Sequence, residues 1–282
     1  SGGSEKTSYN FSAGYLEEQG LTMHTDFERL SLNAGIESQI SENVKVGFTT
    51  YITQTDRNWG STEALRSAYR ARPTGTPFFD DIVEPNLRDT NYGPVGPYAF
   101  FMGIDDSQVI NPLIETDPMN FQRGRKGNSL LANVFAEIKL ADGLKFKTSY
   151  SAYETTAREG DYRGTYTKSQ KGSRNPKVNT WNEKTSNYTL DNTLNYNKTF
   201  GKHRIDATAL FSIFEQYDEY MQIQVEDLAY RSLWHNTGTG ATIKAYNSDL
   251  IESSLASYMG RVNYTFNDKY LLTVTGRYDG AS

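Results

Sequence analysis

The chain has 282 residues, a net charge of −5 and no cysteine, which excludes disulfide scaffolds, thiolate metal sites and cysteine nucleophiles. Aromatic residues make up 13% of the chain, which excludes an intrinsically disordered protein, and no basic run is long enough to predict nucleic-acid binding. The longest apolar clusters, such as residues 98–102, are too short for a membrane-spanning helix.

Apolar and polar residues alternate along most of the chain, which is typical of strands with one buried or lipid-facing side. This alternation predicts an all-β fold, an antiparallel meander of about nine strands. The expected strands are roughly 5–16, 26–39, 43–56, 128–140, 144–156, 185–200, 203–218, 253–267 and 269–280.

The connections between these strands alternate in length. Four tight turns are expected near 40–43, 141–143, 201–203 and 267–269, where Gly, Asn, Asp or Ser supports tight backbone geometry. Longer loops are expected at 17–25, 57–127, 157–184 and 219–252. Because every tight turn falls at one end of the sheet and every long loop at the other, the pattern predicts part of a transmembrane β-barrel.

The longest loop, 57–127, has its own features. Its stretch "STEALRSAYRARP" predicts a short helix that begins at Ser61 or Thr62 and ends before Pro73. A connection of this length in a compact protein is usually functional or disordered. We therefore treat 1–282 as one barrel segment with a long extracellular loop at about 57–127.

The two faces of the predicted sheet differ in charge. Apolar side chains occupy one face, with Asn192 as the main exception and Thr50 and Thr148 as milder ones, and we expect this face to contact lipid. A lysine or arginine at the bilayer midplane costs about 2–4 kcal/mol, whereas a charge facing a wet lumen carries no such penalty. The residues predicted to line the lumen include Arg29, Glu37, Glu137, Asp191, Asp206, Arg261 and Arg277.

Tyrosine and phenylalanine gather near both ends of the strands, which indicates two interfacial aromatic girdles, with cross-strand packing in a soluble sheet as the alternative. Aromatic residues in the loops are the best candidates for ligand contact, because aromatic faces stack on sugars and apolar side chains. Packing of one loop against another, or against a partner protein, is the alternative for each of them. These residues are Trp59, Phe78, Phe79, Tyr92, Tyr98, Trp181 and Trp234.

No catalytic or metal-binding constellation is present in the sequence. His24, His203 and His235 form no metal spacing, and no nucleophile elbow or phosphate-binding loop occurs. The densest basic stretch, Arg123 to Lys126, is interpreted as a solvated loop or strand end. The sequence therefore predicts a protein that is not an enzyme and uses no cofactor or metal.

Nine strands cannot close a typical bacterial barrel, which has an even number of strands, and an open sheet would leave unpaired backbone groups in lipid. We therefore expect the chain to be a segment of a longer protein that carries the export signal, the remaining strands and a plug. Two other classes stay open at this point: a passive outer-membrane porin-type barrel and a soluble β-rich glycan-binding module.

Several segments resemble the barrel of SusC-like TonB-dependent outer-membrane transporters of Bacteroidetes. They are "YNFSAGYLEEQG", "DFERLSLNAGIESQISENVKVGF", "YTLDNTLNYNKTFGKHRIDATALFSIFE" and "SYMGRVNYTFNDKYLLTVTGRYDGAS". The resemblance implies a barrel of about 22 strands in the outer membrane that imports oligosaccharides or peptides. It also implies coupling to TonB through a missing N-terminal part, and a SusD-like lipoprotein as a lid.

Overall fold

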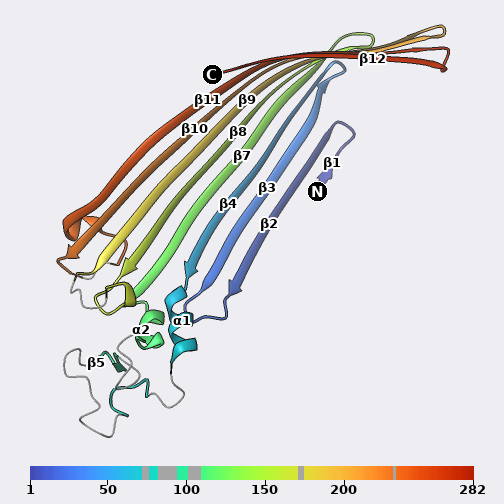
Figure 1. The fold of residues 1–282 in the computed structure, drawn as a ribbon. Helices are drawn as coiled ribbons and strands as arrows, with labels where there is room; N and C mark the ends of the chain where they lie inside the picture. The colour runs from blue at the N-terminus through green and yellow to red at the C-terminus, as the bar shows by residue number, and fades with distance from the viewer. Residues whose placement is uncertain (72–75, 82–93, 101–108, 171–174, 231–232) are drawn as a thin grey trace.

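A computed structural model describes residues 1–71, 76–81, 94–100, 109–170, 175–230 and 233–282. Its main feature is a ten-stranded antiparallel sheet in which every strand pairs with its neighbours in chain order (Figure 1). The sheet is open between its first and last strands. The strands are β1 (Gly2–Gly3), β2 (Thr7–Gln19), β3 (Asp26–Ser41), β4 (Val44–Trp59), β7 (Phe121–Ala141), β8 (Leu144–Arg163), β9 (Lys177–Phe200), β10 (His203–Leu228), β11 (Gly240–Phe266) and β12 (Tyr270–Ala281).

The nine long strands confirm the predicted all-β meander, but most of them extend further at the loop end. The largest extension is in β11, which begins at Gly240 rather than near residue 253, and β9 begins at Lys177 rather than near 185. The predicted boundaries were wrong here because these extensions carry polar residues on both faces, so the alternation stops while the hydrogen-bonded ladder continues. As a result Trp181 lies inside β9 and Trp59 ends β4, and neither residue is in a loop.

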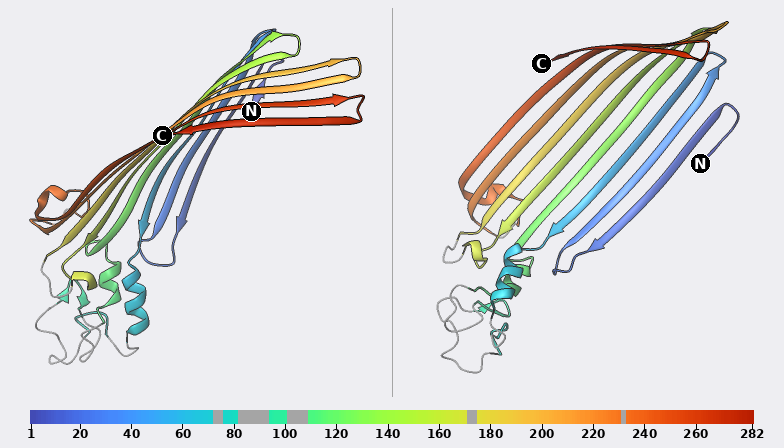
Figure 2. Two further views of the ribbon diagram at one scale, coloured as in Figure 1. Left: turned by 45° about the horizontal axis from the view of Figure 1, so that its top comes forward. Right: turned by 45° about the vertical axis from the view of Figure 1, so that its right-hand side comes forward.

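The tight turns lie together at one end of the sheet and the longer connections at the other, as predicted (Figure 1). Backbone geometry at the turns matches their residues, since Gly143 has φ = 77° and Asn267 has φ = 51°, a region that Gly and Asn tolerate best. Figure 2 shows that the helices and short loop strands lie only at the loop end of the twisted sheet.

The long connection after β4 contains the predicted helix and three further elements. Helix α1 (Thr62–Arg70) starts at Ser61, whose hydroxyl accepts a hydrogen bond from the backbone N–H of Glu63. The further elements are helix α2 (Pro112–Thr116) and the strand pair β5 (Pro94–Val95) and β6 (Tyr98–Ala99). Within the described ranges, neither helix has the length and apolar character needed to cross a bilayer.

One face of the sheet is apolar and uncovered, and we call it the apolar face and its opposite the polar face. In the register, Tyr9 aligns through Val134 to Ile213 along one row of apolar side chains that crosses the sheet. Val134 is 50% exposed and Val274 is 60% exposed. The buried clusters instead lie at the loop end, so the sheet is not one layer of a soluble sandwich.

The apolar run crosses the strands obliquely, as expected for tilted strands in a membrane. On β2 the apolar run extends from Tyr9 to Tyr15, so its midpoint along the strand is position 12. On β11 it extends over residues 256–266, so its midpoint is position 261. The register carries Ser12 to Ser253 on β11, eight residues from that centre, over seven strand-to-strand steps. With 3.3 Å per residue and 4.8 Å between strands, this shift gives a tilt of about 40°, within the range of outer-membrane barrels.

Candidate functional site at the loop end of the polar face

The residues predicted to line a lumen share the polar face. Most of them bond to neighbours on that face. Lys45 Nζ lies 2.6 Å from Glu37, Lys145 Nζ lies 3.0 Å from Glu137, and Arg277 Nε lies 2.9 Å from Asp279. That these residues face a closed lumen stays a prediction. By strand register, the residues on this face are Arg29, Glu37, Glu137, Asp191, Asp206, Arg261 and Arg277.

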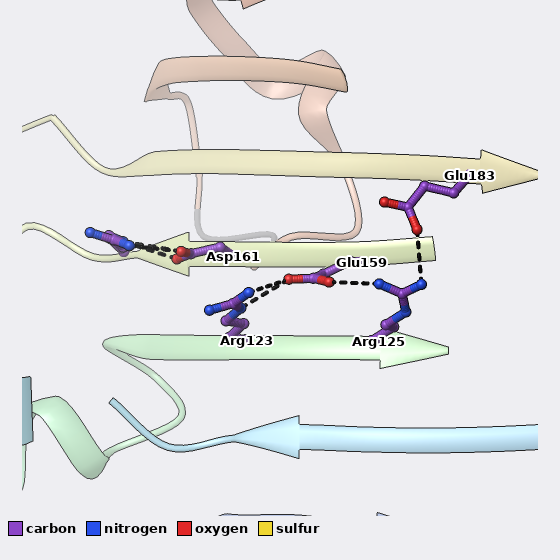
Figure 3. Close-up of polar contacts among 6 residues, drawn as sticks. Arg123, Arg125, Glu159, Asp161 and Glu183 are labelled. Carbon is purple, nitrogen blue, oxygen red and sulfur yellow. Dashed lines mark hydrogen bonds and ion pairs between the residues drawn. The ribbon is translucent and has the colours of Figure 1, made fainter. Parts of the chain in front are cut away.

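A network of arginines and carboxylates crosses the polar face near the loops. Arg123 donates to Glu159 Oε1 from Nη2 at 2.6 Å and from Nε at 2.9 Å. Arg125 bridges two strands, from Glu159 Oε2 at 3.3 Å to Glu183 Oε2 at 2.8 Å (Figure 3). The Glu159 side chain is only 12% exposed, so its charge is held between the two guanidinium groups.

Aromatic rings extend this network toward β3. The Arg123 guanidinium carbon lies 4.8 Å from the Trp59 ring centroid, and the Arg57 carbon lies 4.6 Å from that of Phe27. Trp181 aligns with Glu159 in the register of β8 and β9. We call this group the mouth patch and define it as Phe27, Arg57, Trp59, Arg123, Arg125, Glu159, Trp181 and Glu183.

The mouth patch brings together two predicted contact residues, Trp59 and Trp181, with a charge network that the sequence interpretation missed. The basic stretch Arg123 to Lys126 was interpreted as solvated, and its two arginines, Arg123 and Arg125, do keep part of their side chains exposed. Their partner Glu159 is distant in sequence and meets them only through the pairing of β7 with β8. No signal in the sequence alone identifies that register.

Trp234 lies elsewhere, on the side of the sheet that carries the apolar face. It is 3% exposed and packs with Tyr162, Val178 and Val225. A Cβ added at Gly160 would lie 2.2 Å from the indole, so this glycine provides the space that the ring occupies. Trp234 therefore packs a loop onto the sheet, the alternative that the sequence left open.

The remaining predicted contact residues belong to the long connection between β4 and β7. Phe78 pairs with Tyr98, their ring centroids 6.0 Å apart, and the Phe79 N–H donates to the carbonyl of Pro97. Tyr98 packs on a small core of Val95, Phe100, Ile110 and Ile114. Tyr92 lies outside the described residues.

A buried carboxylate joins two of the long connections. Glu115 of α2 is 2% exposed, and it accepts hydrogen bonds from the Ser61 hydroxyl at 2.7 Å and from the backbone N–H of Lys168. The Lys168 ammonium also lies 2.7 Å from Glu63, and this hydrogen bond lowers the pKa of the Glu63 carboxyl. These contacts hold the loop after β4 against the loop after β8.

Comparison with known proteins gives matches along the whole chain, although no family model matches. TonB-dependent receptors P3 and P39 of Formosa agariphila are 27% and 25% identical over all of this chain. The chain spans about a quarter of their length, 27% and 25% respectively.

Solved structures give the same fold. The RagAB peptide transporter matches 99% of this chain and 31% of its own chain, with a TM-score of 0.75 and 19% identity. FpvA of P. aeruginosa, bound to pyoverdines, matches 98% of this chain and 33% of its own, with a TM-score of 0.53 and 13% identity.

The tilted apolar band, the one-sided loops and these structural matches define an outer-membrane β-barrel segment. Within that class, the sequence of the whole chain is similar to part of the TonB-dependent receptors, and the segment corresponds to a fragment of their barrel. The tight turns are therefore periplasmic, and the long connections and the mouth patch are extracellular.

Proposed function

We propose that the chain is part of a SusC-like active transporter that imports oligosaccharides or peptides in a TonB-coupled cycle. The observation that carries the proposal is the match to TonB-dependent receptors along the entire chain. The fold shared with the RagAB peptide transporter supports it. TonB would act through parts of the receptor beyond this segment.

In this proposal the polar face lines the lumen and the mouth patch is the first barrel surface that a substrate meets. Paired charges are tolerated on a wet surface, whereas the exposed apolar face suits lipid. Aromatic rings beside hydrogen-bond donors are typical of ligand sites, because the rings bury apolar surface while the donors fix orientation. Trp59 and Trp181 are the contact residues we propose.

A SusD-like lipoprotein is the proposed lid on the extracellular side. The described parts of the long connection after β4 support this assignment, because they form a small core of their own and the Glu115 contacts fix their position at the loop end of the sheet. Phe78, which is 42% exposed, and Tyr98 belong to this region and are the proposed lid contacts. Purification of the full-length receptor from native outer membrane should recover a surface lipoprotein, and its absence at low salt would count against the lid.

Uptake in cells tests the transport proposal directly. Cells that express the full-length receptor should accumulate fluorescently labelled oligosaccharides or short peptides only when TonB and the proton gradient are intact. Uptake that persists without TonB would indicate a passive porin-type barrel instead.

Alanine substitutions test the proposed surface. Trp181→Ala should weaken binding of an imported probe, whereas Tyr278→Ala, which removes a 71% exposed ring from the apolar face, should leave binding unchanged. Equal effects of the two variants would contradict the assignment of the substrate to the polar face.

A further inference from the structure

We propose that Arg57 of the mouth patch and Arg29, which lies beside the patch on β3, together form a site for an anionic group of the ligand, a carboxylate. This inference rests on the proposed function and specifies a chemical feature of its ligand. It begins from two guanidinium groups that take no part in the charge network of Figure 3.

Arg57 is held by aromatic rings rather than by carboxylates. Its guanidinium carbon lies 4.6 Å from the Phe27 ring centroid and 5.7 Å from that of Trp59. A guanidinium stacked on rings keeps the N–H donors in its plane free for another partner. In the part of the chain that the structure describes, Arg57 has no hydrogen bond or ion pair, and its side chain is exposed.

On the polar face at this end of the sheet, Arg123, Arg125 and Arg163 already have carboxylate partners. Arg123 and Arg125 share Glu159, and Arg125 also binds Glu183. Arg163 donates to Asp161 from Nη2 at 2.8 Å and from Nε at 3.0 and 3.3 Å. Their charges are therefore largely neutralised within the network, and Arg57 is left as an additional cation beside it.

Arg29 adds a second cation next to Arg57. It lies on β3 two residues from Phe27, which pairs directly with Arg57 in the register of β3 and β4. Its side chain is exposed and, among the described residues, has no ion pair. The facing acid on β2 is Glu18, opposite Phe27, and among the described residues it forms no ion pair or hydrogen bond with either arginine.

Two exposed guanidinium groups on adjacent strands suit an oxyanion. A carboxylate presents two acceptor oxygens in the spacing of a guanidinium fork, and such charge-assisted bonds are about twice as strong as neutral ones. Trp59, which lies under both Arg57 and Arg123, provides an apolar surface for the rest of the ligand. A neutral ligand would leave this pair of cations without a partner.

Calorimetric titration of the purified full-length receptor in detergent tests the site. The probes are tetragalacturonate with its neutral methyl ester, and tetraglutamate with neutral tetraglutamine. We expect at least one acidic probe to bind about tenfold more tightly than its neutral counterpart. Arg57→Gln and Arg29→Gln should each remove most of that difference without weakening binding of the neutral probe.

The control is Arg204→Gln. Arg204 lies on the same face beside a periplasmic turn, where it pairs with Asp206 at 3.6 Å, and its loss should not change binding of either acidic probe. Heat-modifiable migration on gels confirms that each variant is folded.

The outcomes separate this inference from the proposed function. Preference for tetragalacturonate supports the site with an acidic glycan as ligand, and preference for tetraglutamate supports it with an acidic peptide. Equal binding of acidic and neutral probes, or binding of neither acidic probe, overturns the anionic site. TonB-dependent uptake of a neutral probe would still support the proposed function in both of those cases.

Discussion

Two single-arginine variants, one on the apolar face of β7 and one on the polar face of β8, test which side of the sheet contacts lipid. Val134 is the middle residue of the five apolar-face positions from Leu130 to Ile138 and is 50% exposed. In the membrane this position lies near the bilayer midplane, where an arginine costs about 2–4 kcal/mol. Val134→Arg should therefore lower the free energy of unfolding by that amount.

The matched variant is Ser149→Arg on the polar face. Ser149 aligns with Asp191 in the register of β8 and β9, so an arginine there gains a carboxylate neighbour in a wet environment. We expect its effect to stay within about 0.5 kcal/mol. The two variants should then differ by at least about 1.5 kcal/mol, which is at least about tenfold in the ratio of folded to unfolded receptor.

The assay is urea unfolding of the full-length receptor in lipid vesicles, followed by tryptophan fluorescence. A second pair tests the tilt, because Phe11 and Ser254 share one register row but only Phe11 lies within the apolar run. Phe11→Arg should be costly and Ser254→Arg tolerated. If Ser149→Arg destabilised the receptor as much as Val134→Arg, the assignment of the two faces would be refuted.

Three further predictions concern the extracellular loops. Gly160→Val should expel the Trp234 indole, destabilise its cluster by about 1–3 kcal/mol and shift its fluorescence to the red, because the added Cβ meets the ring. Glu115→Gln should speed proteolysis of the loop after β8, because the carboxylate that anchors Ser61 and the Lys168 N–H loses its charge, at about 1–3 kcal/mol. Burial, and then the nearby Arg158 and Lys126, lower the pKa of His235. The unfolded loop therefore takes up a proton at higher pH than the folded loop, so the stability of the folded loop should fall as the pH drops below 6.5 and level off below the lowered pKa. Trp234 fluorescence measures this change.

Each of these predictions has a control. Gly276→Ala should change neither the stability nor the Trp234 fluorescence, because an added Cβ there meets no atom within 4 Å. Glu115→Asp keeps the charge and should retain part of the protection from proteolysis. His235→Gln should remove the pH dependence, and its persistence would assign the effect to another group.

The sequence predicts the sheet well where the membrane imposes a pattern and poorly where water is on both sides. The apolar alternation located all nine strands, since lipid on one side and water on the other requires it. The strand extensions that begin at Lys177 and Gly240 were not predicted, because polar residues occur on both faces there. Helix α1 was predictable because its capping residue and its end signal are local.

The candidate site depends on contacts that only the register creates. Arg125 contacts Glu159 and Glu183 across three strands. The Trp234 ring packs against Gly124 and Gly160, which lie opposite each other in the pairing of β7 with β8. Residue types suggested that the tryptophans matter, yet they did not separate Trp181 on the polar face from Trp234 in a packed cluster. Strand pairing supplies that distinction.

The oblique apolar run gives the barrel wall an uneven height above the bilayer. With strands tilted by about 40°, each residue raises the chain by about 2.6 Å. On β11 the ladder continues for 16 residues beyond Ala256, about 40 Å, while on β2 it ends four residues beyond Tyr15, about 10 Å. Large molecules that approach along the cell surface, such as antibodies or phage tail fibres, therefore reach the β9–β11 flank far above the lipid, and epitopes should concentrate on that flank.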